Sequence, residues 1–185
     1  MPTLPVAANP ADVLAFWREA GKTKWFTHDP AFDSEIRARF QPLWQAAAAN
    51  NLSDWEEASE SALALTIVLD QFPRNMFRGE ARAFATDSPA RAVAERAIAR
   101  GFDREVPETE RVFFYLPFEH SENRADQERS LALVRATGDA ELLKWAQLHA
   151  DIIERFGRFP HRNAILGRVS TPAELEFLAG SNAPF

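Results

Sequence analysis

The strongest constraint on the fold is a repeated dipeptide in which a polar residue with a side-chain acceptor immediately precedes proline. Such a residue caps a helix well, and proline at the first helical position has no amide hydrogen to leave unpaired. Two further pairs, Thr171 with Glu174 and Ser53 with Glu56, have the spacing of a capping box. The dipeptides that predict helix starts are Asn9-Pro10, Asp29-Pro30, Ser88-Pro89 and Thr171-Pro172.

Apolar residues between these starts recur every three or four positions, which is the period of a helix and not of a strand. The seven glycines mostly follow such runs and are expected to end helices, where a positive φ costs glycine least. Pro42 and Pro117 are expected to kink or divide helices, and Pro73 is expected to end one at Gln71. Helices are predicted at residues 10–20, 30–49, 54–70, 89–100, 108–119, 124–136, 140–156 and 172–179.

Short connections favour antiparallel neighbours, so the expected fold is all-α and built from stacked antiparallel helical hairpins. With 185 residues, the chain is expected to form a single helical domain, residues 1–185, that buries a sizeable core. Its large aromatic residues are better explained as core than as a cofactor site. The expected packing anchors are Trp17, Trp25, Phe26, Trp44, Trp55 and Trp145.

Charge and composition exclude several classes of protein. The formal charge of -6 opposes binding of a phosphate backbone, so we expect no nucleic-acid partner. The chain has no cysteine, no visible signal peptide and no run of apolar residues long enough to span a bilayer. We therefore expect a soluble, cytoplasmic protein with no membrane partner, and the sequence leaves its oligomeric state open.

One short motif occurs twice, as "QFPRN" at residues 71–75 and as "FPHRN" at residues 159–163. The simplest interpretation is structural, because an arginine just beyond a helix end can donate to the last free carbonyls. Arg74 and Asn75 are expected in that position, and Arg162 likewise follows Phe159-Pro160. The alternative is that the two motifs contribute to a binding site.

The local charge around the second motif makes a site worth considering. Residues 155–168 contain four arginines and His161 but no acid, and arginines beside apolar side chains require anionic partners. The acidic segment 117–128 is one source of partners, and a bound carboxylate or phosphate is the other. The sequence does not decide between these two sources of anionic partners.

The four histidines have different expected roles. His28 is expected at the surface, and His149 is expected as a hydrogen-bonded histidine on the apolar face of its helix. His120 and His161 lie in predicted turns beside charged residues, where an imidazole can transfer protons near neutral pH. No tight ligand spacing joins the histidines and no glycine-rich phosphate loop is present, so we predict neither a metal site nor a cofactor.

The polar motifs together resemble a known family. "LDQFPRNMFRG", "LPFEHSENRADQERS" and "HADIIERFGRFPHRNAILGRVSTPAELEFL" are similar to the bacterial proteins grouped as domain of unknown function 924. The likeness runs from about residue 10 to residue 180, and it departs near the start, where "FWREAG" replaces "FWFG". The resemblance implies an all-helical, tetratricopeptide-like superhelical arrangement, although no 34-residue repeat is visible. It implies little about activity.

Three hypotheses follow for the function. The leading one is a binding domain for a small anionic molecule or a peptide carboxylate. The second is an enzyme, such as a hydrolase, with His120 or His161 as general base and Glu122 or Asp126 orienting it. The third is a purely structural polar cluster. The candidate ligand-binding residues are Asp70, Arg74, Asn75, Asp126, Gln127, His149, Arg158, Arg162 and Asn163, and the candidate catalytic residues are His120, Glu122 and His161.

Overall fold

The computed structural model describes residues 8–180, which form eight α-helices, several short 3-10 helices and no strand. The all-α prediction is confirmed. Two compact units divide the chain: the first extends to Arg78 and includes Arg82–Pro117, and the second contains Gly79–Ala81 and the chain from Phe118 onward. No helix within residues 8–180 is both long enough and apolar enough to cross a membrane.

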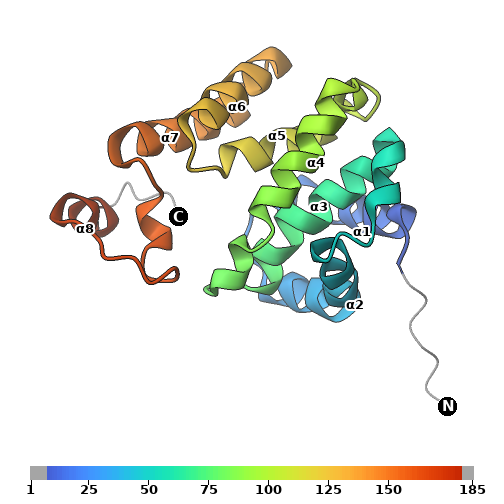
Figure 1. The fold of residues 1–185 in the computed structure, drawn as a ribbon, viewed down its shortest axis with the longest axis horizontal. Helices are drawn as coiled ribbons and strands as arrows, with labels where there is room; N and C mark the ends of the chain where they lie inside the picture. The colour runs from blue at the N-terminus through green and yellow to red at the C-terminus, as the bar shows by residue number, and fades with distance from the viewer. Residues whose placement is uncertain (1–7, 181–185) are drawn as a thin grey trace. The chain divides into compact units, whose positions relative to one another are not determined.

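A buried helix, α3 (Ser59–Met76), forms the centre of the first unit and packs against three of its neighbours, α1, α2 and α4 (Figure 1). The consecutive pairs α2·α3 and α3·α4 are the hairpins that short connections predicted. The tetratricopeptide-like arrangement stays a prediction. The other elements up to the second unit are α1 (Pro10–Trp25), α2 (Pro30–Ala48), η1 (Ser53–Glu57), η2 (Ala81–Phe84), α4 (Asp87–Ala99), η3 (Phe102–Arg104), η4 (Glu108–Glu110) and α5 (Val112–Glu119).

Three of the four predicted caps are confirmed, at Asn9, Asp29 and Thr171, whose side chains accept from first-turn amides. The prediction at Ser88 is wrong, because α4 begins at Asp87, two residues before Pro89, and its cap position is Thr86. The Ser53 capping box is also absent: a 3-10 helix begins there, and its cap makes no side-chain hydrogen bond. Local spacing therefore identified these helices more reliably than it identified their first residues.

The predicted helix end at Gln71 is wrong, since α3 continues through Pro73 to Met76. Proline lacks the amide hydrogen that would bond to the carbonyl four residues earlier, which is that of Leu69. The hydroxyl of Thr86 donates to this carbonyl at 2.6 Å and replaces the missing bond. Pro42 and Pro117 likewise lie inside α2 and α5 without dividing them.

Glycine ends helices as expected at Gly138 and Gly157, which cap α6 and α7 in the left-handed conformation with φ of 74° and 70°. Gly21 behaves differently. It has non-helical φ and ψ inside α1, so that the helix continues beyond a break to Trp25 instead of ending near residue 20.

The second unit is built around a hairpin of α6 (Arg124–Thr137) and α7 (Ala140–Phe156), which lie side by side in Figure 1. The short helices η5 (Pro160–Arg162) and α8 (Pro172–Ala179) follow and contact each other. Ile152, Ile153 and Phe159 form a buried hydrophobic cluster in this unit. Two predicted packing anchors are not core residues: Trp145 is 39% exposed and, in the first unit, Phe26 is 54% exposed.

Candidate functional site

The first motif lies in the last turns of α3, so Arg74 is inside the helix and not beyond its end as predicted. Its Nη1 donates to the Asp70 carbonyl and to Asp87 Oδ1, both at 2.8 Å, and lies 3.2 Å from Asp70 Oδ1. Burial alone lowers the pKa of Arg74, but the negative charges of Asp70 and Asp87 outweigh it and raise the pKa. The guanidinium therefore stays charged beside carboxylates of its own unit.

The rest of the first motif also bonds within its unit. Asn75 Nδ2 donates to Asp33 Oδ1 at 2.7 Å, and Asp33 also accepts two hydrogen bonds from Arg78. Gln71 Nε2 donates to Asp70 Oδ2 at 2.7 Å. These contacts support the structural interpretation for this part of the candidate site.

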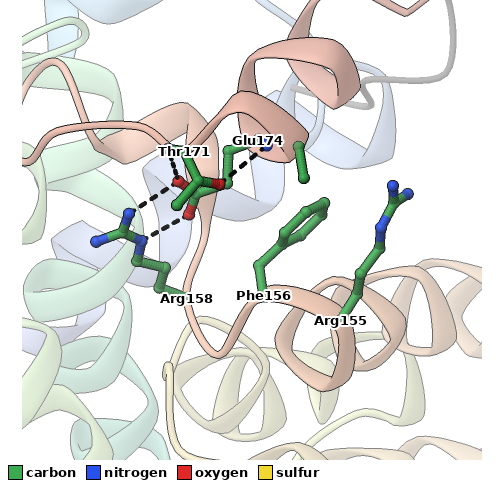
Figure 2. A pocket seen from close by; sticks show the side chains of 6 residues that line it. Arg155, Phe156, Arg158, Thr171 and Glu174 are labelled. Carbon is green, nitrogen blue, oxygen red and sulfur yellow. Dashed lines mark hydrogen bonds and ion pairs between the residues drawn. The ribbon is translucent and has the colours of Figure 1, made fainter.

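In the second unit, two arginines of segment 155–168 are neutralised internally. Arg158 donates through Nε and Nη2 to the two oxygens of Glu174, at 2.6 Å and 2.8 Å (Figure 2). Glu174 is only 2% exposed and also forms the capping box of α8 with Thr171. The bonds from Arg158, and then the amide of Thr171, lower the pKa of Glu174 to about 2.

Glu122 forms the ion pair that the acidic segment predicted. Its oxygens accept from Arg168 at 2.7 Å and 2.9 Å, and Oε1 also accepts from the Phe159 amide at 2.8 Å. Burial raises the pKa of Glu122, but the bonds from Arg168 and from the amide outweigh it, so the pKa is lowered. Arg168 also donates to Asn163 Oδ1, which ties the second motif to this pair.

The turn after α5 is held by side chains of α6. Gln127 Nε2 lies within hydrogen-bond distance of three backbone carbonyls, those of Phe118, Glu119 and Ser121, at 3.4, 2.7 and 2.6 Å. Ser121 Oγ donates to Asp126 Oδ2 at 2.6 Å. Gln127 was predicted as a ligand-binding residue, and these contacts show that it orders the segment carrying Glu119 and His120.

Two histidines and one arginine lie around the buried ring of Phe159, and a third histidine, His120, lies beside one of them. We call these four residues, His120, His149, His161 and Arg162, the histidine cluster. The ring centroids of His149 and His161 both lie 5.6 Å from that of Phe159, and the rings of His120 and His149 are 6.2 Å apart. The guanidinium carbon of Arg162 lies 4.5 Å from the centre of the Phe159 ring. His120 and His161 are partly exposed, and Arg162 is buried.

Within this cluster, His149 is oriented by a carboxylate. Its Nδ1 lies 3.0 Å from Glu119 Oε1 and 2.9 Å from the Trp145 carbonyl. Both neighbours are acceptors, so Nδ1 carries the proton, and in the neutral ring Nε2 holds the lone pair. The hydrogen-bonded histidine predicted on this helix face is confirmed, with Glu119 as its partner.

The structure thus brings the candidate residues of the second unit into one polar region, while Asp70, Arg74 and Asn75 belong to the first unit. A site shared by the two motifs stays a prediction. Sequence reasoning gave no individual role to Glu119 or Arg168, and it noticed Glu174 only as a cap. In residues 8–180, no three histidine or acidic side chains are arranged to hold a metal ion.

Fold and polar motifs define a class of all-helical proteins with an arginine- and histidine-rich region. The sequence matches a family model over residues 13–182, and the chain belongs to this family, described as "Bacterial protein of unknown function (DUF924)". A solved structure, that of the protein of unknown function ATU0120 from Agrobacterium tumefaciens, is 50% identical. It superposes with a TM-score of 0.89 over 92% of this chain and 96% of that chain. No curated protein matches the sequence.

Proposed function

We propose that the protein is a binding domain that takes a small anion, a phosphate or a carboxylate compound, at the histidine cluster. The observation that carries the proposal is the placement of two imidazoles and the Arg162 guanidinium around Phe159, with the His120 ring beside that of His149. Each of these side chains donates hydrogen bonds in its charged form and none is acidic. Such a concentration of donors favours an anionic ligand.

Neighbouring residues orient several hydrogen-bond donors of the histidine cluster. The guanidinium carbon of Arg162 lies over the Phe159 ring, and the N–H groups of a guanidinium point outward from its edge. Glu119 and the Trp145 carbonyl fix the ring of His149, and Gln127 orders the turn that carries His120. Prearranged donors lose less conformational entropy when a ligand binds.

A thermal unfolding experiment tests this proposal. Inorganic phosphate and acetate, at millimolar concentration and against sodium chloride of equal ionic strength, should raise the unfolding midpoint. At a hundred times the dissociation constant the stabilisation is about 2.7 kcal/mol. His161→Ala should reduce the shift, and His28→Ala is the control, since His28 is an exposed histidine of the first unit. The proposal fails if neither compound shifts the midpoint more than chloride does.

A second candidate function is acid–base catalysis, and the distance of 3.0 Å between Glu119 Oε1 and His149 Nδ1 favours it. A carboxylate that holds one imidazole nitrogen protonated prepares the other nitrogen to accept a proton. The predicted roles of His120 and His161 as bases stay predictions. Glu122 hydrogen bonds to Arg168 and the Phe159 amide, so Glu119 is the better placed orienting carboxylate.

A panel of p-nitrophenyl esters and phosphates tests catalysis. Turnover should follow a bell-shaped pH profile, as expected for an essential imidazole. Both His149→Gln and Glu119→Gln should reduce kcat, and His28→Gln should not. Turnover that survives His149→Gln would exclude this residue as the base.

A further inference from the structure

A pocket of 480 Å³ lies between the end of α7 and the first turn of α8, entirely within the second unit. Its lining includes Arg155, Phe156 and Arg158 on one side and Thr171, Ala173 and Glu174 on the other. None of the three histidines of the cluster lines it. Its volume is within the range of small-molecule sites, which is roughly 300–1,000 Å³.

The two arginines of this pocket differ in how their charge is neutralised. Arg158 binds both oxygens of Glu174 and donates to the Val169 carbonyl at 2.9 Å. Arg155 is exposed, and its described contacts within residues 8–180 are with aromatic rings and include no carboxylate. The pocket therefore has one positive charge that the described part of the chain does not balance.

The guanidinium of Arg155 lies near two aromatic rings. Its central carbon lies 4.7 Å from the centre of the Phe156 ring and 5.9 Å from that of Phe177, and these two rings are 5.2 Å apart. Figure 2 shows Phe156 between Arg155 and the Arg158–Glu174 pair. A guanidinium whose neighbours are aromatic rings, which accept no conventional hydrogen bond, has N–H donors to offer a planar carboxylate.

We propose that this pocket binds a monocarboxylate with an apolar, aromatic body. Arg155 would take the carboxylate, and Phe156 and Ala173 would contact the apolar part. A single unbalanced charge suits a monoanion, and a more highly charged phosphate would face the carboxylate of Glu174. This site is separate from the histidine cluster and does not depend on the function proposed for it.

Benzoate titration, followed by amide chemical shifts in NMR spectra of the full chain, tests the proposal. We expect shifts at Phe156 and Ala173, with benzamide and acetate binding more weakly because each lacks one half of the ligand. Arg155→Gln should weaken benzoate binding about tenfold or more, since it removes a charge-assisted hydrogen bond. The matched control is Lys144→Gln, because Lys144 is an exposed cation over Trp145 on the same helix but outside the pocket.

Four outcomes would overturn the proposal. Benzamide or inorganic phosphate that binds as tightly as benzoate would exclude recognition of a monocarboxylate. Acetate that binds equally tightly would exclude a role for the rings. Equal losses in Arg155→Gln and Lys144→Gln would show a general charge effect. Shifts confined to the histidine cluster would place benzoate at the other site, and His161→Ala would then remove them.

Discussion

The hydroxyl of Thr86 donates to the carbonyl of Leu69, which is the carbonyl that Pro73 leaves without a helical partner. The same hydroxyl accepts from Trp44 Nε1 at 3.0 Å, and Thr86 is only 3% exposed. One buried side chain thus satisfies two polar groups and allows α3 to continue through a proline.

Replacing Thr86 by valine should therefore destabilise the protein, because the isosteric change removes both hydrogen bonds. A buried group left without a partner costs about 1–3 kcal/mol. Urea unfolding should show this loss in Thr86→Val and little loss in Thr86→Ser, which keeps the hydroxyl. Adding Pro73→Ala should recover part of the stability, since alanine restores an amide for Leu69. Equal stability of the valine and serine variants would contradict this role.

Acid should weaken the second unit through Glu174. Its pKa is lowered from 4.5 to about 2, so the ionised form is favoured by folding. The stabilisation is complete above the unfolded pKa and is lost as the pH falls from about 4.5 toward 2. In thermal unfolding against pH, Glu174→Gln should be less stable at neutral pH and should lose less stability on acidification.

The control for this experiment is Glu176→Gln, because Glu176 is exposed on the same helix and has no described partner. Its acid profile should match that of the natural protein. A Glu174→Gln profile that also matches would show that the Arg158–Glu174 pair contributes nothing to the pH dependence.

The single tyrosine gives a prediction for alkaline pH, because any phenol titration of this protein belongs to that one residue. Tyr115 is 5% exposed, and its hydroxyl donates to Asp103 Oδ2 at 2.8 Å. Burial first, and then this bond to a carboxylate, raise the pKa of Tyr115. The folded protein should keep the phenol neutral above pH 10, and its stability should fall as the pH rises beyond the unfolded pKa of about 10.

Ultraviolet absorbance of the phenolate measures this titration directly. The phenolate absorbance should appear together with unfolding and not at a lower pH than unfolding. Tyr115→Phe should cost about 1–3 kcal/mol at neutral pH, because it leaves a buried oxygen of Asp103 without this donor. Phenolate formed reversibly near pH 10 in the folded state would exclude the buried hydrogen bond.

Two ion pairs with the same i, i+4 spacing should differ strongly in their effect on stability. Arg74 pairs with Asp70, whose side chain is 1% exposed, whereas Arg39 pairs with Glu35 and both side chains are about half exposed. Arg74→Ala leaves a buried carboxylate without this cation and should cost about 3–5 kcal/mol. Arg39→Ala should cost only about 0.3–0.5 kcal/mol by urea unfolding. Similar losses would contradict the burial argument.

Several features within one helical turn were predictable from the sequence, although the caps expected at Ser53 and Ser88 were not found. The capping box of Thr171 and Glu174 and the glycine end at Gly157 depend on residues at most four positions apart, so the local sequence contains the whole signal. The prediction that a helix ends at Gln71 was wrong because the decisive contact is not local. The group that compensates for Pro73 is Thr86, which reaches α3 only after the chain has folded back.

The amino-acid sequence by itself determined an all-helical chain, most of its helix positions and the polar motifs from which a site is built. Tertiary structure decided which charges meet. Glu119 and His149 are separated by 30 positions and Glu122 and Arg168 by 46, and nothing local distinguishes these acids from their neighbours. The physical reason is that helix caps depend on backbone geometry within a turn, whereas ion pairs depend on how helices pack.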